Sequence, residues 1–368
     1  MNGLYIHIPF CKAKCRYCDF ASYSGKLSTA SAYVDAVCAE MAQYRGEKFD
    51  TVYFGGGTPT VLDISLFDKL FSSIHSCFDI AKNSEITVEA NPATIDYAKA
   101  KALLSLGVNR ISLGAQSMID TELACLGRIH TAADVVSTYN AVADAGIDNI
   151  SLDLMYALPG QTMDTLSKSV DGVLKLNPKH ISCYGLKIEE GTPFYHMAQK
   201  GEIPYPDDDI SADMYDYIVD VLGSNGYDRY EISNFSRTGY RSRHNCKYWQ
   251  CVDYIGIGLG AASCYKGERY TNCADFEAYF NGHKKSEHIV LDTNDKISEF
   301  VILGLRLIKD GVCKKEFNQK FGNDIYDIFG SEIKKHISAG LLIDNGSNLC
   351  LTKAGCYVSN YVMSDFLL

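Results

Sequence analysis

The first half of the chain alternates short apolar runs with amphipathic stretches, and this alternation restricts the folds open to it. Six runs have the length and composition of buried strands: residues 4–8, 51–54, 85–89, 110–113, 149–155 and 180–186. The stretches between them space their apolar residues as helices do, over 30–43, 65–78, 97–106, 132–145 and 165–176. Strands that alternate with helices of this length form βαβ units and a parallel sheet. The predicted fold class is therefore α/β, either a partial barrel of six βα units or a doubly wound open sheet.

The residues that follow the strands favour the barrel. Glycine or a polar group comes directly after the second, third and fourth runs, in the segments GGGT (55–58), EANP (89–92) and GAQS (114–117). The fifth run contains Asp153. In a barrel of parallel strands all these positions converge on one ligand-binding face, whereas an open sheet brings only its central strands together. We therefore expect a partial, TIM-like (β/α)6 barrel.

The pattern changes after residue 190. Residues 191–209 are rich in proline and acidic side chains and precede a helix predicted over 210–222, and residues 227–270 are rich in glycine and aromatic residues. Beyond residue 293 two or three helices and a turn at 340–346 predict a small α+β module of the winged-helix kind. The expected divisions are a barrel core over 1–190, a barrel extension over 191–290 and the C-terminal module over 291–368.

Composition excludes several classes of protein. With 35 basic and 45 acidic residues the formal charge is −10, which repels a phosphate backbone, so we expect no nucleic-acid partner. No apolar stretch reaches the roughly 18 residues of a membrane span, and the N-terminus lacks the pattern of a signal peptide. We therefore expect a cytoplasmic protein without a transmembrane segment. Its 14 cysteines should then be mostly reduced thiols.

Three cysteines stand apart from the others. Cys11, Cys15 and Cys18 have the spacing C-x3-C-x2-C directly after the first predicted strand, at the ligand-binding end of the proposed barrel. Thiolates on one short loop can hold a soft metal or an iron–sulfur cluster. A structural zinc site takes four ligands, and no fourth cysteine lies near. We favour a four-iron cluster with one open iron, and zinc or three unrelated thiols are the alternatives.

This loop resembles the cluster loop of radical S-adenosylmethionine (SAM) enzymes. A longer series of motifs resembles the oxygen-independent coproporphyrinogen III oxidase family: YIHIPF (5–10), GGGTPT (55–60), EANP (89–92), GAQS (114–117), LGRIHT (126–131) and DLMYALPG (153–160). The resemblance covers most of the chain. It implies a radical SAM barrel and a [4Fe-4S] cluster whose open iron is chelated by SAM, which the cluster then cleaves to a 5′-deoxyadenosyl radical.

The resemblance also assigns SAM-binding residues. Tyr5 and Tyr17 should flank the cofactor, and Gly56, Gly57 and Thr58 should approach its methionine portion. The remaining polar groups of SAM are expected to contact Glu89, Gln116, Arg128 and Asp153. These residue types suit the task, because glycine lets the backbone come close and arginine pairs with carboxylates.

Two features point to one branch of the family. The coproporphyrinogen oxidases carry a further cysteine two places after the third, and here that position is Phe20. The segment HNCKYW at 244–249 matches the HNxxYW motif of the heme-chaperone branch, HemW. This branch implies heme as a ligand, transfer of heme to acceptors such as respiratory hemoproteins, and as one expectation a cluster-dependent homodimer. An oxygen-independent coproporphyrinogen III oxidase is the alternative.

His244 of the HNxxYW motif is a candidate heme ligand. Imidazole suits heme iron, so His244 could be the axial ligand. The alternative is structural: His244 hydrogen-bonds a loop carbonyl while Trp249 fills the seam between the barrel and the C-terminal module. The sequence does not decide between these roles, and it does not identify a catalytic residue.

Overall fold

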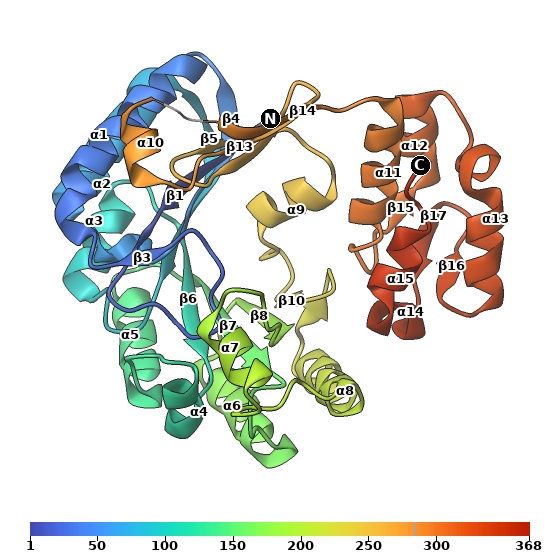
Figure 1. The fold of residues 1–368 in the computed structure, drawn as a ribbon, viewed down its shortest axis with the longest axis horizontal. Helices are drawn as coiled ribbons and strands as arrows, with labels where there is room; N and C mark the ends of the chain where they lie inside the picture. Colours follow the sequence, from blue (N-terminus) through green and yellow to red (C-terminus); the bar gives the residue numbers. More distant parts are fainter. Residues whose placement is uncertain (283–284) are drawn as a thin grey trace.

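The computed structural model describes residues 1–282 and 285–368. Its central strands are all parallel and follow one another in the order of the sequence: β1 (Asn2–Ile8), β4 (Lys48–Gly56), β5 (Asp79–Ala90), β6 (Arg110–Gln116), β7 (Asn149–Tyr156) and β8 (His180–Gly185). The six predicted strands are confirmed. A doubly wound sheet would reverse its strand order at a switch point, and this order does not reverse. The sheet therefore curls in one direction as a partial barrel, as predicted (Figure 1).

The predicted helices cover the outer side of these strands (Figure 1). They are α1 (Ala30–Met41), α2 (Ile64–Cys77), α3 (Tyr97–Ser105), α5 (Ala132–Asp144) and α6 (Met163–Leu176), each within two residues of its predicted bounds. Thr131 and Thr162 begin α5 and α6, where each side chain accepts a hydrogen bond from a backbone amide of the first turn. The short helix α4 (Asp120–Cys125) was not predicted.

Later parts of the chain extend both edges of the sheet. On one side β11 (Tyr254–Ile257) pairs parallel with β1, and β12 (Ala262–Tyr265), β13 (Glu268–Asn272) and β14 (Lys285–Val290) continue antiparallel. On the other side β10 (Asn234–Ser236) and β9 (Asp228–Arg229) follow β8. The helices of this region are α7 (Pro193–Gln199), α8 (Asp208–Ser224), α9 (Arg243–Trp249) and α10 (Phe276–Phe280). Helix α8 is the one predicted over 210–222, and α9 carries the HNxxYW motif.

The C-terminal residues form a small unit with a separate apolar core, which includes Val301, Phe317, Ile333 and Leu349. Helices α11 (Thr293–Gly304), α12 (Lys314–Phe321) and α13 (Ile325–Ser338) pack against a sheet of β15 (Val312–Cys313), β17 (Asn348–Leu351) and β16 (Leu342–Asp344). The segment predicted as a turn at 340–346 contains strand β16, and the turn of the β16–β17 hairpin falls at 345–347. Helices α14 (Lys353–Tyr357) and α15 (Ser359–Ser364) follow it and were not predicted. No helix of the described residues is long and apolar enough to cross a membrane.

Helix α9 lies between the barrel strands and the C-terminal unit (Figure 1). The guanidinium carbon of Arg306 stands 4.2 Å from the centre of the Trp249 ring, a cation–π contact. Arg306 also pairs with the fully buried Glu231 at 3.3 Å. Trp249 therefore occupies the seam between the two parts, which is its expected structural role.

Candidate functional site: a cysteine loop over a barrel cavity

The cysteine loop closes one end of the barrel. It is bounded by two short parallel strands, β2 (Phe10–Cys11) and β3 (Tyr23–Ser24), so both ends of the loop are anchored. Cys11, Cys15 and Cys18 are free thiols that line a cavity of about 460 Å3 inside the barrel. The cavity continues between strands β4 to β8. The structure therefore brings the three predicted cluster ligands together at the mouth of a pocket.

Each of the three sulfurs has a polar neighbour suited to a thiolate. The pairs are Thr58 Oγ1 with Cys11 (3.6 Å), Arg128 Nη1 with Cys15 (3.4 Å) and Ser22 Oγ with Cys18 (3.7 Å). Among residues 1–282 and 285–368, no three His, Cys, Asp or Glu side chains come close enough together to hold a single metal ion. Three thiols spread around one cavity, each beside a hydrogen-bond donor, are a donor set that fits a larger iron–sulfur cluster.

Glycines shape the wall next to the cysteines. Gly56 has φ 110°, and a β-carbon there would stand 2.4 Å from the ring of His7. A β-carbon on Gly57 would lie 2.7 Å from the carbonyl oxygen of Phe10. Any larger residue would displace the backbone under the loop, so these two positions require glycine.

Glu89 is the carboxylate nearest this wall. Its two oxygens accept hydrogen bonds from the Tyr53 hydroxyl (2.8 Å) and the Gly56 amide (3.1 Å). Burial raises the pKa of Glu89 to about 7, against the opposing effect of the Tyr53 hydrogen bond. The group therefore changes charge near neutral pH.

Asp153 is the second carboxylate of the cavity. One of its oxygens accepts from the hydroxyls of Ser112 (3.3 Å) and Ser151 (3.5 Å). Burial raises the pKa of Asp153 to about 6, and the positive charge of Arg110 partly offsets this rise. Two acceptors, Glu89 on β5 and Asp153 on β7, can therefore receive hydroxyl or ammonium groups of a ligand.

Arg128 joins the cysteine loop to the barrel wall. Besides Cys15, its guanidinium donates to Asn91 Oδ1 (2.6 Å) and to the carbonyl of Gly114 (2.6 Å). Gln116 ends β6 with a left-handed φ of 67°, and its side-chain oxygen accepts from the Tyr184 hydroxyl at 2.8 Å. A left-handed glutamine held by a specific bond is the kind of strain found at ligand sites.

The two predicted flanking tyrosines differ in position. Tyr17 lines the cavity with the cysteines. Tyr5 stands behind the wall, where its ring stacks on Tyr53 at 6.1 Å and its hydroxyl bonds His7 Nδ1. Thr58 also lies outside the main cavity and reaches it through the Cys11 sulfur and Asn91.

His244 is placed in the core beneath the site. Its Nδ1 bonds Thr51 Oγ1 (2.9 Å), its Nε2 bonds the Tyr248 hydroxyl (2.8 Å), and the residue is 1% exposed. Burial lowers the pKa of His244 to about 3, so the ring is neutral. Both nitrogens are committed in this arrangement, and axial ligation of heme would require the ring to leave it. The geometry favours the structural alternative, with two side-chain hydroxyls as the partners of His244 in place of the loop carbonyl that was expected.

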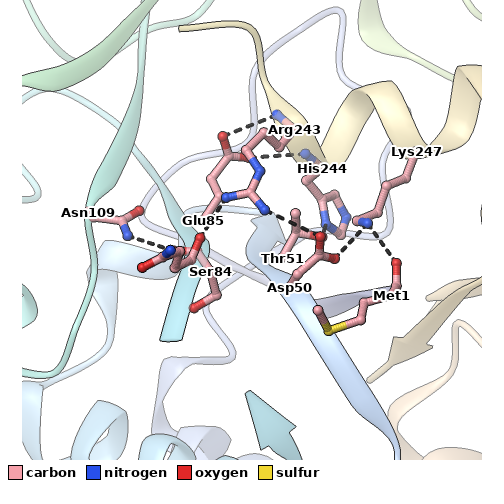
Figure 2. Close-up of polar contacts among 10 residues, drawn as sticks. Met1, Asp50, Thr51, Ser84, Glu85, Asn109, Arg243, His244 and Lys247 are labelled. Carbon is pink, nitrogen blue, oxygen red and sulfur yellow. Dashed lines mark hydrogen bonds and ion pairs between the residues drawn. The ribbon is translucent and has the colours of Figure 1, made fainter. Parts of the chain in front are cut away.

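The N-terminus of α9 is anchored to the strands, as Figure 2 shows. The carboxylate of Glu85 accepts hydrogen bonds from the backbone amides of Arg243 (3.1 Å) and His244 (3.0 Å). Lys247 lies between the carboxylate of Asp50 (2.7 Å) and the carbonyl of Met1 (2.8 Å). The HNxxYW helix is therefore fixed to β4, to β5 and to Met1, the residue that precedes β1.

Several site residues escaped the sequence analysis. Asn91 lay within a quoted motif but received no role, and Asn245 of HNxxYW lines the cavity although its neighbour His244 does not. Tyr53, Arg110 and Tyr184 lie on strands and also line it. The signal for Arg110 was a cation at the start of an otherwise apolar strand.

The comparisons with known proteins agree with this geometry. Residues 5–172 match the model of the radical SAM superfamily, and residues 291–358 match that of the HemN C-terminal domain. The fold is similar to the coproporphyrinogen III oxidase HemN of Escherichia coli, with a TM-score of 0.85 over 99% of this chain and 89% of that one, at 22% identity.

Relatives of higher identity span the full length. The heme chaperone HemW of Lactococcus lactis is 38% identical over 100% of this chain and 97% of its own. That of Bacillus subtilis is 36% identical over 100% and 99%. Heme chaperone HemW of Escherichia coli is 32% identical over 99% and 98%. With this identity along its whole length, the chain belongs to the HemW heme chaperone family of the radical SAM superfamily.

Proposed function

We propose that this chain binds heme and transfers it to heme-accepting proteins, with respiratory hemoproteins as the expected class. A [4Fe-4S] cluster on Cys11, Cys15 and Cys18 and a SAM molecule in the cavity accompany this role. The observation that carries the proposal is the cysteine loop itself. It brings three sulfurs to the cavity and places Phe20, 64% exposed, where the coproporphyrinogen oxidases have another cysteine.

The cluster, when bound, supplies an open iron for SAM and an electron to it. The chain's own residues orient both groups. Arg128 donates a hydrogen bond to the sulfur of Cys15, and Thr58 donates one to the sulfur of Cys11. Gly56 and Gly57 allow SAM to approach the backbone. Tyr17, Gln116, Glu89 and Asp153 line the space that SAM would occupy, where the two carboxylates accept from its ammonium and hydroxyl groups. Tyr5 acts indirectly, by supporting Tyr53.

Heme is proposed to bind at the mouth of the cavity. Phe20 offers an exposed aromatic face on which a porphyrin can stack. Lys14 and Lys187 border the same opening and carry the charge that propionates need. His244 as the axial ligand remains a prediction that requires the ring to break its bonds to Thr51 and Tyr248.

One anaerobic experiment tests the proposed function. The cluster is reconstituted, and SAM, a reductant and coproporphyrinogen III are added before mass spectrometry of the products. We expect no protoporphyrinogen, and in parallel we expect saturable heme binding by the same sample. Decarboxylated product would instead establish the oxidase, and heme binding that never saturates would refute the chaperone. Phe20→Ser, with the exposed Phe280→Ser as matched control, should weaken heme binding by about tenfold.

SAM binding should depend on pH through Glu89. Both oxygens of Glu89 can accept, and the group can pair with the ammonium of SAM, only when the carboxylate is ionised. Its pKa of about 7 means that roughly a tenth is ionised at pH 6 and nine-tenths at pH 8. The affinity for SAM should therefore rise by about tenfold over this interval, as measured by equilibrium dialysis. Glu89→Gln should bind weakly and show a flatter profile, with the residual slope due to Asp153. Glu122→Gln, a buried carboxylate outside the cavity, is the control, and a wild-type profile in Glu89→Gln would contradict this role.

A further inference from the structure

Two arginines line the cavity, and they differ in their hydrogen bonding. Arg128 donates to a sulfur, an amide oxygen and a carbonyl. Arg110 is 2% exposed, and within residues 1–282 and 285–368 its guanidinium has neither a hydrogen bond nor an ion pair, with Nε and Nη1 both buried. The carboxylates of Asp153 and Glu89 are near enough for the charge of Arg110 to lower their pKa values, but neither bonds its guanidinium. A buried guanidinium without a hydrogen bond is costly, so its presence beside a cavity indicates that a partner comes from outside the chain.

Arg110 lies deep in the barrel, away from the cysteines. In the strand register Arg110 pairs with Thr87 of β5. Thr87 pairs with Tyr53 of β4, and Tyr53 pairs with Tyr5 of β1. Gly114, whose carbonyl accepts a hydrogen bond from Arg128, lies four residues further along the same strand. At a rise of about 3.3 Å per residue, the two α-carbons are about 13 Å apart.

The surroundings of Arg110 are polar and well ordered. His180 bonds Ser151 Oγ (2.8 Å) and the Tyr230 hydroxyl (2.9 Å), and all three residues are buried. Burial, and secondarily the charge of Arg110, lowers the pKa of His180 far below its usual value, so this ring is neutral and cannot compete for an anion. Asn245 also lines the cavity, and the described part of the chain shows no hydrogen bond to its side-chain amide. Arg110 and Asn245 together offer unused donors.

We propose that Arg110, assisted by Asn245, binds a carboxylate of a small-molecule ligand at the deep end of the cavity. The inference rests on the proposed function in one respect, because SAM and heme supply the two candidate carboxylates: the amino-acid group of SAM and a porphyrin propionate. Asp153 and Glu89 accept the positive and hydroxyl groups of a ligand, and Arg110 receives its negative end. The HNxxYW motif thus contributes to the site through its asparagine, while its histidine holds the helix in place.

Binding measurements on Arg110→Met test the inference. Cluster-loaded wild type, Arg110→Met and Arg110→Lys are titrated with SAM, with heme and with heme dimethyl ester, in which the propionates are blocked. We expect Arg110→Met to lose at least about tenfold in affinity for one of the two acids, and Arg110→Lys to retain most of it. A loss confined to SAM identifies the amino-acid carboxylate. A loss for heme, with the ester bound equally weakly by wild type and variant, identifies a propionate. Arg45→Met removes an exposed arginine as the control.

Two outcomes separate this inference from the proposed function. If the folded Arg110→Met protein, checked by circular dichroism, binds SAM and heme like wild type, the carboxylate site is refuted while the proposed function stands. If wild type binds neither ligand, the proposed function fails, and succinate then decides the inference. A rise in melting temperature with succinate, relative to chloride at equal ionic strength, in wild type but not in Arg110→Met would support it. Equal shifts in both proteins would overturn it.

Discussion

Replacing Cys15 with alanine is expected to abolish the iron–sulfur cluster. With three sulfurs at the cavity, each is one third of the protein's ligand set, and the loss of one should lower cluster affinity by at least about tenfold. The Cys15 sulfur also accepts a hydrogen bond from Arg128, which links the loop to the barrel wall. The substitution therefore removes both the cluster ligand and the hydrogen bond that orients it. After anaerobic reconstitution, Cys15→Ala should lack the brown absorbance and nearly all iron and sulfide.

Two other cysteines provide matched controls for this experiment. Cys38 lies on α1, and Cys125 lies on α4 and packs near Tyr17; neither lines the cavity. Alanine at either position should leave iron and sulfide content unchanged. Full iron content in Cys15→Ala, or a loss in Cys125→Ala as large as that in Cys15→Ala, would contradict the assignment of the three ligands.

The barrel could be predicted because its strands carry strong local signals. Buried parallel strands are continuous apolar runs, and polar or glycine residues at their ends identify the ligand face. The edge strands carry no such signal. All six residues of β14 are exposed, and its place is set by pairing with β13 rather than by a buried face. The short helices α14 and α15 likewise depend on the hairpin they follow.

The site divides in the same way. Residues in the loops after strands were predicted, because motif and position agree there. Arg110 was missed because its importance depends on which face of β6 points inward. The alternation of Arg110, Ser112 and Gly114 with Ile111 and Leu113 contains that information, since only the first set lines the cavity. His244 was ambiguous because the partners of its ring include Thr51, a residue 193 positions away.

His244→Ala is expected to have the largest effect on stability. The substitution removes a buried ring that stacks on Tyr53 at 5.1 Å and leaves the hydroxyls of Thr51 and Tyr248 without this partner. A cavity and two lost hydrogen bonds should together lower the free energy of unfolding by about 3 kcal/mol. Denaturant unfolding of the cluster-free protein measures this change. His75→Ala, which removes an exposed histidine from α2, should change it by less than about 0.5 kcal/mol.

The pH dependence distinguishes a buried structural histidine from a heme ligand. The pKa of His244 is depressed to about 3, so its stabilising effect is present above the unfolded value of about 6.5 and is lost as pH falls toward 3. Wild type should therefore lose more stability than His244→Ala between pH 6.5 and pH 4. If the ring keeps its bonds to Thr51 and Tyr248 when heme binds, the folded fraction of His244→Ala should still bind heme with an unchanged Soret band, because neither ring nitrogen is then available to iron. A variant with normal stability and no heme spectrum would make His244 the axial ligand, and α9 would then have to move for heme to bind.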